Sequence, residues 1–338
     1  DPEMDVDVDV KFDVTDELLG TDVVIFEYLT DEAYPDELVA FEEDLGSAEQ
    51  TIHFPKIGTT FTDDATGDHI AVADRVVKHT DKVAYNNLLV GKTYKTVAEL
   101  YFTDNGEAVK DADGKAITQE VEFTPEKPDG TVDATFEFDA SLLAGRSIVA
   151  FETIYLDGKE VAAHADLTDE GQTIHYPNVG TTFTDDATGK HTANAAKKVK
   201  HTDKVEYSNL LVGKSYKTVA ELYFKDTGEA VKDVNGKAIT KEVEFTPESP
   251  DGMVDVTFEF DASLLAGKSI VAFEKIYTDD RLVGSHADLT DEGQTITYPP
   301  TKPPVKTGDP VKPIIPIALG IIAAAGIAVM IVLKKKHK

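Results

Sequence analysis

Two groups of side chains in this chain combine hydroxyl, imidazole, carboxyl and carboxamide functions. The first group consists of Thr59, Glu152, His164, Asp169 and Gln172. The second group has the same residue types 122 positions later, at Thr181, Glu274, His286, Asp291 and Gln294. A hydroxyl is a weak nucleophile until a neighbouring imidazole takes its proton, and carboxyl groups can stabilise the charges that then develop. Each group therefore contains the components needed for acyl transfer.

These side chains belong to a long internal repeat. Residues 57–70 recur as residues 179–192, and residues 164–174 recur as residues 286–296, each after 122 positions. That period is too long for a solenoid unit and fits a complete sandwich domain. The sequence predicts three domains: a partial or diverged first repeat at 1–54, and full repeats at 55–176 and 177–298.

Within each full repeat the apolar residues have the period of β-strands. Segments such as residues 95–102 (KTVAELYF) and 131–139 (TVDATFEFD) alternate apolar and polar side chains. Asn-Gly at 105–106 and Asp-Gly at 129–130 supply the positive φ that tight hairpins require. The one helical turn that the pattern favours is residues 139–145. The predicted fold is all-β, with tandem immunoglobulin-like β-sandwich domains.

Two neighbouring threonines could supply the hydroxyl in each repeat. Either Thr59 or Thr60 could react, and the same choice recurs in the second full repeat at Thr181 and Thr182. On an alternating strand Thr59 lies on the same face as Ile57 and Phe61, which favours a buried position. We therefore predict that Thr59 and Thr181 are the reactive residues.

The order of these motifs resembles the T-Q ester bond domains, also called VaFE repeats, of Gram-positive adhesins and pilins. The name motif, VAFE, is present at residues 149–152 and again at 271–274. A His followed after five residues by Asp, after three more by Gln and then by Thr occurs at 164–173 and at 286–295. The resemblance extends over residues 57–298.

In this family a threonine hydroxyl attacks a glutamine side-chain amide, ammonia leaves, and an ester joins the first strand to the last. The resemblance implies two cross-links, Thr59–Gln172 and Thr181–Gln294, each made once and without enzymatic turnover. It implies that His164 and His286 are the bases. The acidic hydrogen-bond donors would be Glu152, Asp169, Glu274 and Asp291. Water has to be excluded, so the site should lie inside the sandwich, and no cofactor or metal is expected.

The partial repeat at residues 1–54 retains only part of this set. Glu27 and Gln50 are in place, but Glu42 occupies the histidine position and Ser47 the aspartate position. We predict no cross-link in this segment.

The C-terminal residues predict a membrane anchor. Residues 313–333 form an uncharged stretch of about 21 residues, long enough for a helix that spans a bilayer. The lysine-rich tail at 334–338 is expected on the cytoplasmic side, so the repeats would face outward. Residues 299–312 form a proline-rich linker suited to crossing a cell wall. Localisation at the extracellular cell surface, anchored to wall or membrane, follows.

Within the linker, residues 304–308 (PVKTG) resemble a sortase sorting signal. In that family a transpeptidase cleaves between Thr and Gly, which here are Thr307 and Gly308, and joins the Thr to the cell wall or to a pilus subunit. The usual pattern is Leu-Pro-x-Thr-Gly, whereas Pro304 and Val305 occupy its first two positions. A sortase of variant specificity is our preferred interpretation, and a plain linker to a single membrane span is the alternative.

Charge and composition exclude several classes of partner and ligand. The net charge of −30 disfavours nucleic acid. With no cysteine, the chain contains neither disulfides nor cysteine-bound metals. The aspartates of residues 5–13 lack the turn glycine and bidentate glutamate of a calcium loop, and predict a charged edge strand. A host or surface ligand would bind a region that precedes Asp1.

The function predicted from these features is the stalk of an adhesin or pilus-like surface protein, locked mechanically by ester bonds. Two alternatives remain at this level. A related pilin module would instead contain Lys-Asn isopeptide bonds. A secreted hydrolase would use the Thr, His and Asp set on an external substrate, which requires an open cleft.

Overall fold

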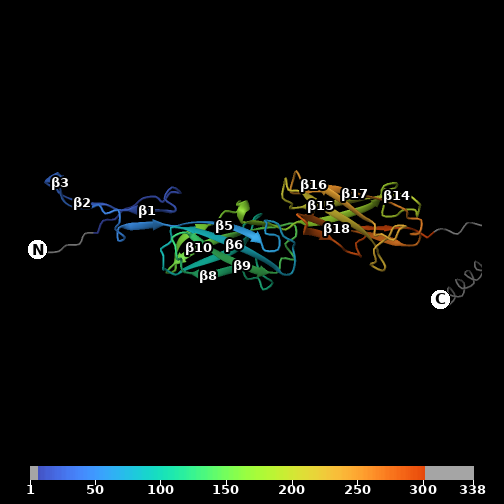
Figure 1. Cartoon of the computed structure of the whole chain (residues 1–338), viewed down its shortest axis with the longest axis horizontal. Helices are drawn as coiled ribbons and strands as arrows, with labels where there is room; N and C mark the ends of the chain where they lie inside the picture. The colour runs from blue at the N-terminus through green and yellow to red at the C-terminus, as the bar shows by residue number, and fades with distance from the viewer. Residues whose placement is uncertain (1–6, 301–338) are drawn as a thin grey trace, which may run out of the picture. The chain divides into compact units, whose positions relative to one another are not determined.

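The structure, a computed structural model, describes residues 7–300 and is built almost entirely of β-strands (Figure 1). It confirms the all-β prediction. No helix among these residues is long and apolar enough to cross a membrane. The predicted sorting residues Thr307 and Gly308, the span at 313–333 and the basic tail lie outside the described residues.

Residues 55–176, here called the central repeat, contain two antiparallel sheets. Their strands are β5 (Lys56–Asp63), β6 (Val77–Asn86), β7 (Tyr94–Phe102), β8 (Thr118–Phe123), β9 (Gly130–Phe138), β10 (Ser147–Leu156), β11 (Lys159–His164) and β12 (Thr173–His175). One sheet has the order β5-β6-β9, and the other has the order β11-β10-β7-β8 with β12 also paired to β10. A single 3-10 turn, η1 (Glu170–Gln172), precedes β12.

Residues 177–298, here called the C-terminal repeat, have the same topology. Their strands are β13 (Asn178–Asp185), β14 (Val199–Ser208), β15 (Tyr216–Phe224), β16 (Thr240–Phe245), β17 (Gly252–Phe260), β18 (Ser269–Thr278), β19 (Arg281–His286) and β20 (Thr295–Thr297). The sheets are β13-β14-β17 and β16-β15-β18-β19, with β20 paired to β18. The 122-residue repeat of the sequence is thus also a repeat of structure.

The core of each repeat lies between its two sheets. In the central repeat Phe61 and Phe136 from one sheet pack with Leu100 and Ile148 from the other, and all four are almost fully buried. The alternation in β6 is regular, because every second side chain from Val77 to Tyr85 is buried. Burial of these apolar faces is the main force that holds the two sheets together. It also encloses the polar groups that share those faces.

The segment before the central repeat has little interior. Its strands are β1 (Thr21–Val24), β2 (Glu27–Asp31), β3 (Tyr34–Glu42) and β4 (Thr51–Phe54), paired as β1 with β4 and β2 with β3. All side chains of β2 and β3 are exposed. The prediction of a charged edge strand at the aspartate run is wrong for residues 7–14, which form no strand because no neighbouring strand pairs with them.

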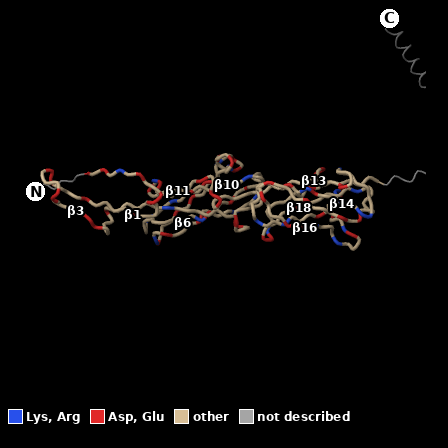
Figure 2. Tube along the Cα trace, turned by 90° about the horizontal axis from the view of Figure 1, so that it is seen from above, with Lys and Arg blue, Asp and Glu red and all other residues tan. Residues whose placement is uncertain are grey.

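Two further features concern loops and charge. Residues 139–145 form turns and not the predicted helical turn, since the Asp139 side chain accepts the N–H of Ser141 and Gly145 adopts a positive φ of 82°. Figure 2 shows acidic residues distributed along all described parts of the chain, in keeping with 63 acidic against 33 basic residues. In the described part of the chain, no group of acidic and histidine residues has a geometry that would hold a metal ion.

Candidate functional site

The structure brings a threonine of the first strand and a glutamine of the last turn together in each repeat. In the C-terminal repeat Gln294 Nε2 lies 2.8 Å from Thr181 Oγ1, and in the central repeat Gln172 Nε2 contacts Thr59 Oγ1. In both cases 113 positions separate the two residues. Both glutamine side chains are fully buried. The pair therefore connects the first strand of each repeat to its end.

The strand geometry selects one threonine of each pair. On β5 the side chains of Ile57 and Phe61 are buried and Thr59, which shares their face, is partly buried. Thr60 points the other way and is exposed. The pattern on β13 is identical, with Thr182 exposed. Thr59 and Thr181 are thus the hydroxyls that face glutamine.

A buried glutamate completes the contact with glutamine. Gln172 Nε2 lies 2.5 Å from Glu152 Oε2, and Gln294 Nε2 lies 2.8 Å from Glu274 Oε2. Both glutamates are at most 1% exposed. They stand on β10 and β18, central strands that pair on both sides, so the carboxyl groups are held in place by the sheets. The glutamine nitrogen, which is the leaving group in ester formation, is therefore placed against a carboxyl group.

Sequence reasoning missed a second buried carboxyl group. Asp81 on β6 and Asp203 on β14 are fully buried and lie next to Glu152 and Glu274. The signal was present in the strand pattern, because Asp81 stands on the inward face of β6 between buried neighbours. A charged residue on an otherwise buried face, repeated 122 positions later, is a sign of a functional or structural partner.

The two carboxyl groups of each site favour the protonated state. Burial is the main cause of the raised pKa of Glu152, and the charge of Asp81 raises it further. Burial also raises the pKa of Asp81, which the nearby His164 partly offsets. In the C-terminal repeat burial raises the pKa of Asp203 and Glu274 in the same way. In a dry interior the charge of one ionised carboxyl group disfavours ionisation of its neighbour.

The histidine and the second predicted aspartate form a pair at the edge of the site. His164 Nε2 lies 3.0 Å from Asp169 Oδ2, and in the C-terminal repeat the corresponding distance from His286 to Asp291 is 3.1 Å. About a quarter of each histidine side chain is exposed. His286 Nδ1 donates to the carbonyl of Val179 at 3.0 Å, so both of its ring nitrogens are engaged.

Two features of this arrangement bear on the roles expected for the histidine and the second aspartate. No hydrogen bond joins either histidine to the threonine hydroxyl within residues 7–300, so the imidazoles do not contact the nucleophile directly. Asp169 and Asp291 are not the interior acids, because about 30% of each side chain is exposed and each accepts a backbone N–H at the start of its turn. Asp81 and Asp203 occupy the interior position instead.

The segment before the central repeat retains a fragment of the same arrangement. Glu27 pairs with Glu42 across β2 and β3, as Glu152 pairs with His164 across β10 and β11. Gln50 is partly buried, and its Oε1 has no hydrogen-bond partner among the described residues. No strand bearing a threonine nucleophile lies against it in the described part of the chain. The described residues of this segment therefore do not form a Thr–Gln site.

Fold and site together define a protein of tandem all-β domains, each with a buried Thr–Gln pair beside two carboxyl groups. The chain belongs to the family described as T-Q ester bond containing domain, which matches residues 2–54, 55–176 and 177–298. No curated protein matches the chain.

The chain is distantly similar to several solved structures. A Mobiluncus mulieris adhesin described as containing intramolecular disulfide, isopeptide and ester bond cross-links is 16% identical, with 65% of this chain and 80% of that chain covered and a TM-score of 0.30. A Bacteroides cellulosilyticus glycosyl hydrolase is 10% identical, with coverages of 63% and 28% and a TM-score of 0.25. Red sea bream transglutaminase is 10% identical, with coverages of 76% and 32% and a TM-score of 0.24.

Proposed function

We propose that this protein is the stalk of an adhesin or pilus-like protein on a bacterial surface, with each full repeat locked by a Thr–Gln ester that it forms itself. The observation that carries the proposal is the buried contact between the first-strand hydroxyl and the last-turn carboxamide, present in both repeats of a T-Q ester bond family member. The product in each repeat is one covalent loop around almost the whole domain.

The reaction transfers one acyl group and balances without any cofactor. Thr59 Oγ1 attacks Cδ of Gln172, the new C–O bond forms, and the C–N bond of the amide breaks. The hydroxyl proton and one further proton leave with the nitrogen as ammonium. Glu152, held protonated against the glutamine nitrogen, is placed to protonate this leaving group.

The hydroxyl proton needs an acceptor inside the site. In the C-terminal repeat the side chain of Thr181 lies against Asp203, whose pKa is raised by burial, so this carboxylate is a stronger base than an exposed one. A protonated His286 beside this group would favour the ionised form of Asp203. The histidine would then act through the aspartate, which agrees with the lack of a direct contact to the hydroxyl.

The ester would change how the domain responds to force. A cross-link that closes a loop of 113 residues stabilises a domain by about 4 to 5 kcal/mol in the chain-entropy model. Under tension an uncross-linked repeat could release the same 113 residues, which corresponds to about 400 Å of extended chain. With the ester, tension would pass from the first strand to the last turn, as a surface stalk requires. The sequence supports attachment through a sortase at Thr307 or through the membrane span at 313–333.

A turnover enzyme is less well supported. The glutamine and glutamate of each site are buried and the nucleophile, Thr59 or Thr181, is partly buried, whereas a hydrolase needs these groups open to substrate. Two surface hollows of about 620 Å³ each are lined by other residues, among them Phe102, Leu142, Phe224 and Leu264.

Intact mass of the folded chain tests the proposal. A loss of one ammonia for each full repeat is expected, two in all. The Gln172→Glu variant has no side-chain amide at this position, so it should lose one ammonia fewer than the parent chain. A folded parent chain with an unaltered mass would overturn the proposal.

A further inference from the structure

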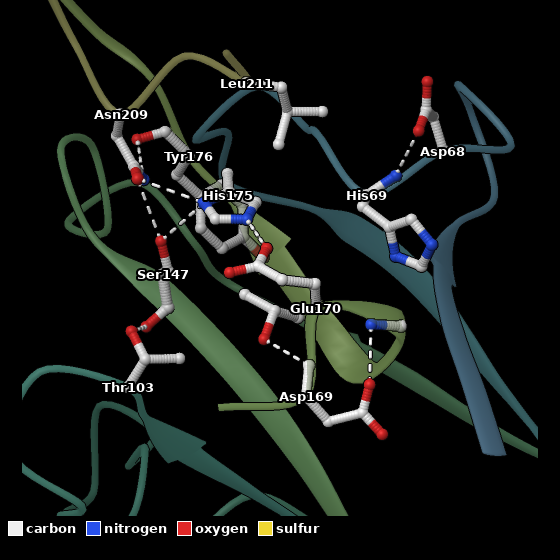
Figure 3. Close-up of polar contacts among 12 residues, drawn as sticks. Asp68, His69, Thr103, Ser147, Asp169, Glu170, His175, Tyr176, Asn209 and Leu211 are labelled. Atoms are coloured by element: carbon white, nitrogen blue, oxygen red, sulfur yellow. Dashed lines mark hydrogen bonds and ion pairs between the residues drawn. The ribbon is translucent and has the colours of Figure 1, made fainter. Parts of the chain in front are cut away.

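A second built arrangement of polar groups lies where the central repeat meets the C-terminal repeat (Figure 3). It is centred on Asn209, which follows β14 and has a positive φ of 63°. This conformation is uncommon for residues other than glycine and is tolerated best by Asn and Asp. The backbone N–H of Asn209 donates to Asp251 Oδ1 at 3.0 Å, which fixes the loop within its own repeat.

The Asn209 carboxamide uses its full hydrogen-bonding capacity on the neighbouring repeat. Its Nδ2 donates to the carbonyls of Arg146 at 2.7 Å and Tyr176 at 3.3 Å. Its Oδ1 lies 3.0 Å from Ser147 Oγ and 3.1 Å from His175 Nδ1. In Figure 3 dashed lines join the Asn209 side chain to Ser147 and to His175. Ser147 Oγ and His175 Nδ1 also lie 2.9 Å apart, so the three side chains form one hydrogen-bonded cluster.

The receiving groups, here called the end face, are held in place by the central repeat itself. Ser147 begins β10 and pairs with His175 across β12. The other ring nitrogen of His175 lies 3.0 Å from Glu170 Oε2. Tyr176 is fully buried, and its hydroxyl lies 2.5 Å from Nε2 of the buried His79. The end face therefore does not depend on Asn209 for its shape.

A related asparagine contact occurs at the junction before the central repeat. Asn87, which is 122 positions before Asn209, also has a φ of 63° and donates to the carbonyl of Thr21 at 2.8 Å and to Asp22 Oδ1 at 2.7 Å. His53 Nδ1 lies 2.7 Å from the same Asp22 carboxylate. Asp22 and His53 pair across β1 and β4, as Ser147 and His175 pair across β10 and β12. Recurrence at both junctions argues against a chance contact.

The end face of the C-terminal repeat differs from that of the central repeat at the position of His175. There Ser269 is retained, but Thr297 occupies the position of His175, and the two hydroxyls lie 2.8 Å apart. No asparagine from another repeat contacts this end face among residues 7–300. Histidine is thus present at the two end faces that receive an asparagine and absent from the one that does not.

An ion pair supports the joint at its rim. Lys214, five residues after Asn209, forms an ion pair with Asp68 of the central repeat. Burial raises the pKa of Asp68, but the hydrogen bond to Lys214 and that from the backbone of His69 lower it more, so its pKa lies below the ordinary value. The pairing of opposite charges adds a second point of contact between the repeats.

We propose that this end face is a binding surface for the asparagine-bearing loop of the next T-Q repeat, and that the joint fixes the orientation of consecutive repeats. The position of the joint in the chain makes it mechanically important. Residues 173–180 lie between Gln172 and Thr181, so they are enclosed by neither of the two loops that the proposed esters would close. Extension of this segment under load would have to break the contacts of the joint together with the pairing of β12 with β10 and of β13 with β14.

The distance distribution between two spin labels tests the joint in the full chain. Because the chain has no cysteine, single cysteines at Glu137 and Glu259, exposed and equivalent positions on β9 and β17, accept labels without interference. The parent should give one narrow distribution by pulsed electron spin resonance. The Asn209→Asp variant keeps size and backbone preference but replaces two donors by a carboxylate that repels two carbonyls. It should broaden the distribution at least two-fold.

Asn235→Asp is the matched control, because the central repeat has Asp113 at that position and the residue lies away from the joint. It should leave the distribution unchanged. His175→Ala, which removes one donor and leaves the loop intact, should also broaden it. An equally narrow distribution in Asn209→Asp, or a broad one in the parent, would overturn the proposal. Far-UV circular dichroism and intact mass report folding and ester formation separately, so a missing ester would not be mistaken for a missing joint.

Discussion

Thr181 Oγ1 lies 2.8 Å from Gln294 Nε2 although 113 positions of the chain separate the two residues. The first strand of the repeat supplies one group and the turn before its last strand supplies the other. Neither group could find the other without the completed two-sheet fold. Ester formation should therefore follow folding and report on it.

Replacement of a single threonine should remove one cross-link. Thr59→Ala should show one ammonia loss fewer by intact mass and should lower the stability of the central repeat by about 4 to 5 kcal/mol, because the unfolded chain regains the entropy of an open loop. Differential scanning calorimetry measures the second effect. Thr60 is exposed on the opposite face of the strand, so Thr60→Ala is the matched control and should still lose two ammonia molecules. The reverse result would reassign the nucleophile to Thr60.

Replacement of the buried aspartate should slow the reaction without preventing the fold. Asp81→Asn retains the shape of the side chain but removes the carboxyl group that corresponds, one repeat earlier, to Asp203, the proposed proton acceptor for Thr181. General acid-base catalysis contributes about 10² to 10⁴ in rate. Mass spectrometry at intervals after refolding should show slow or absent ammonia loss in the central repeat alone. The exposed Glu120→Gln serves as control. Normal reaction rates in Asp81→Asn would show that His164 or another group is the base.

The stability of the uncross-linked protein should fall as pH rises. In the Thr59→Ala/Thr181→Ala variant the carboxyl pairs remain, and burial holds the pKa of Glu152 and Asp81 above their ordinary values. The folded state then binds more protons than the unfolded state above those ordinary values, so each rise in pH favours unfolding. The unfolding temperature should decrease from about pH 5 to pH 8. Adding Glu152→Gln and Glu274→Gln should flatten this dependence, and a rise with pH would contradict the assignment.

Hydroxylamine should distinguish an ester from an isopeptide bond. An ester is cleaved by this nucleophile under denaturing conditions, whereas an amide resists it. The treated chain should gain mass at the glutamine positions and, on denaturing gels, migrate like the Thr59→Ala/Thr181→Ala variant. Resistance to the reagent together with loss of ammonia would indicate a Lys-Asn bond instead.

Much of the site could be predicted from the sequence because its motifs occur in both full repeats. Glu152 and Gln172 stand in recognisable motifs whose spacing is identical in both repeats, and alternation on one strand was enough to favour Thr59 over Thr60. The all-β fold followed from strand periodicity and hairpin turns in the same way. These are local signals, and local signals survive in a single sequence.

Other features were decided only by tertiary structure. Asp81 gained its role because β6 places it against a glutamate 71 positions away. Asp169 lost the expected interior role because its turn lies at the edge of the sheet, where its carboxyl caps a backbone N–H and stays partly in water. Asn209 meets an end face built from three separate segments, which no local pattern encodes. The sequence by itself determined which chemical groups are present and how they recur. The packing of the two sheets determined which of these groups are buried, which are in contact and which have a raised pKa. The reason is that burial and distance are properties of the folded chain alone.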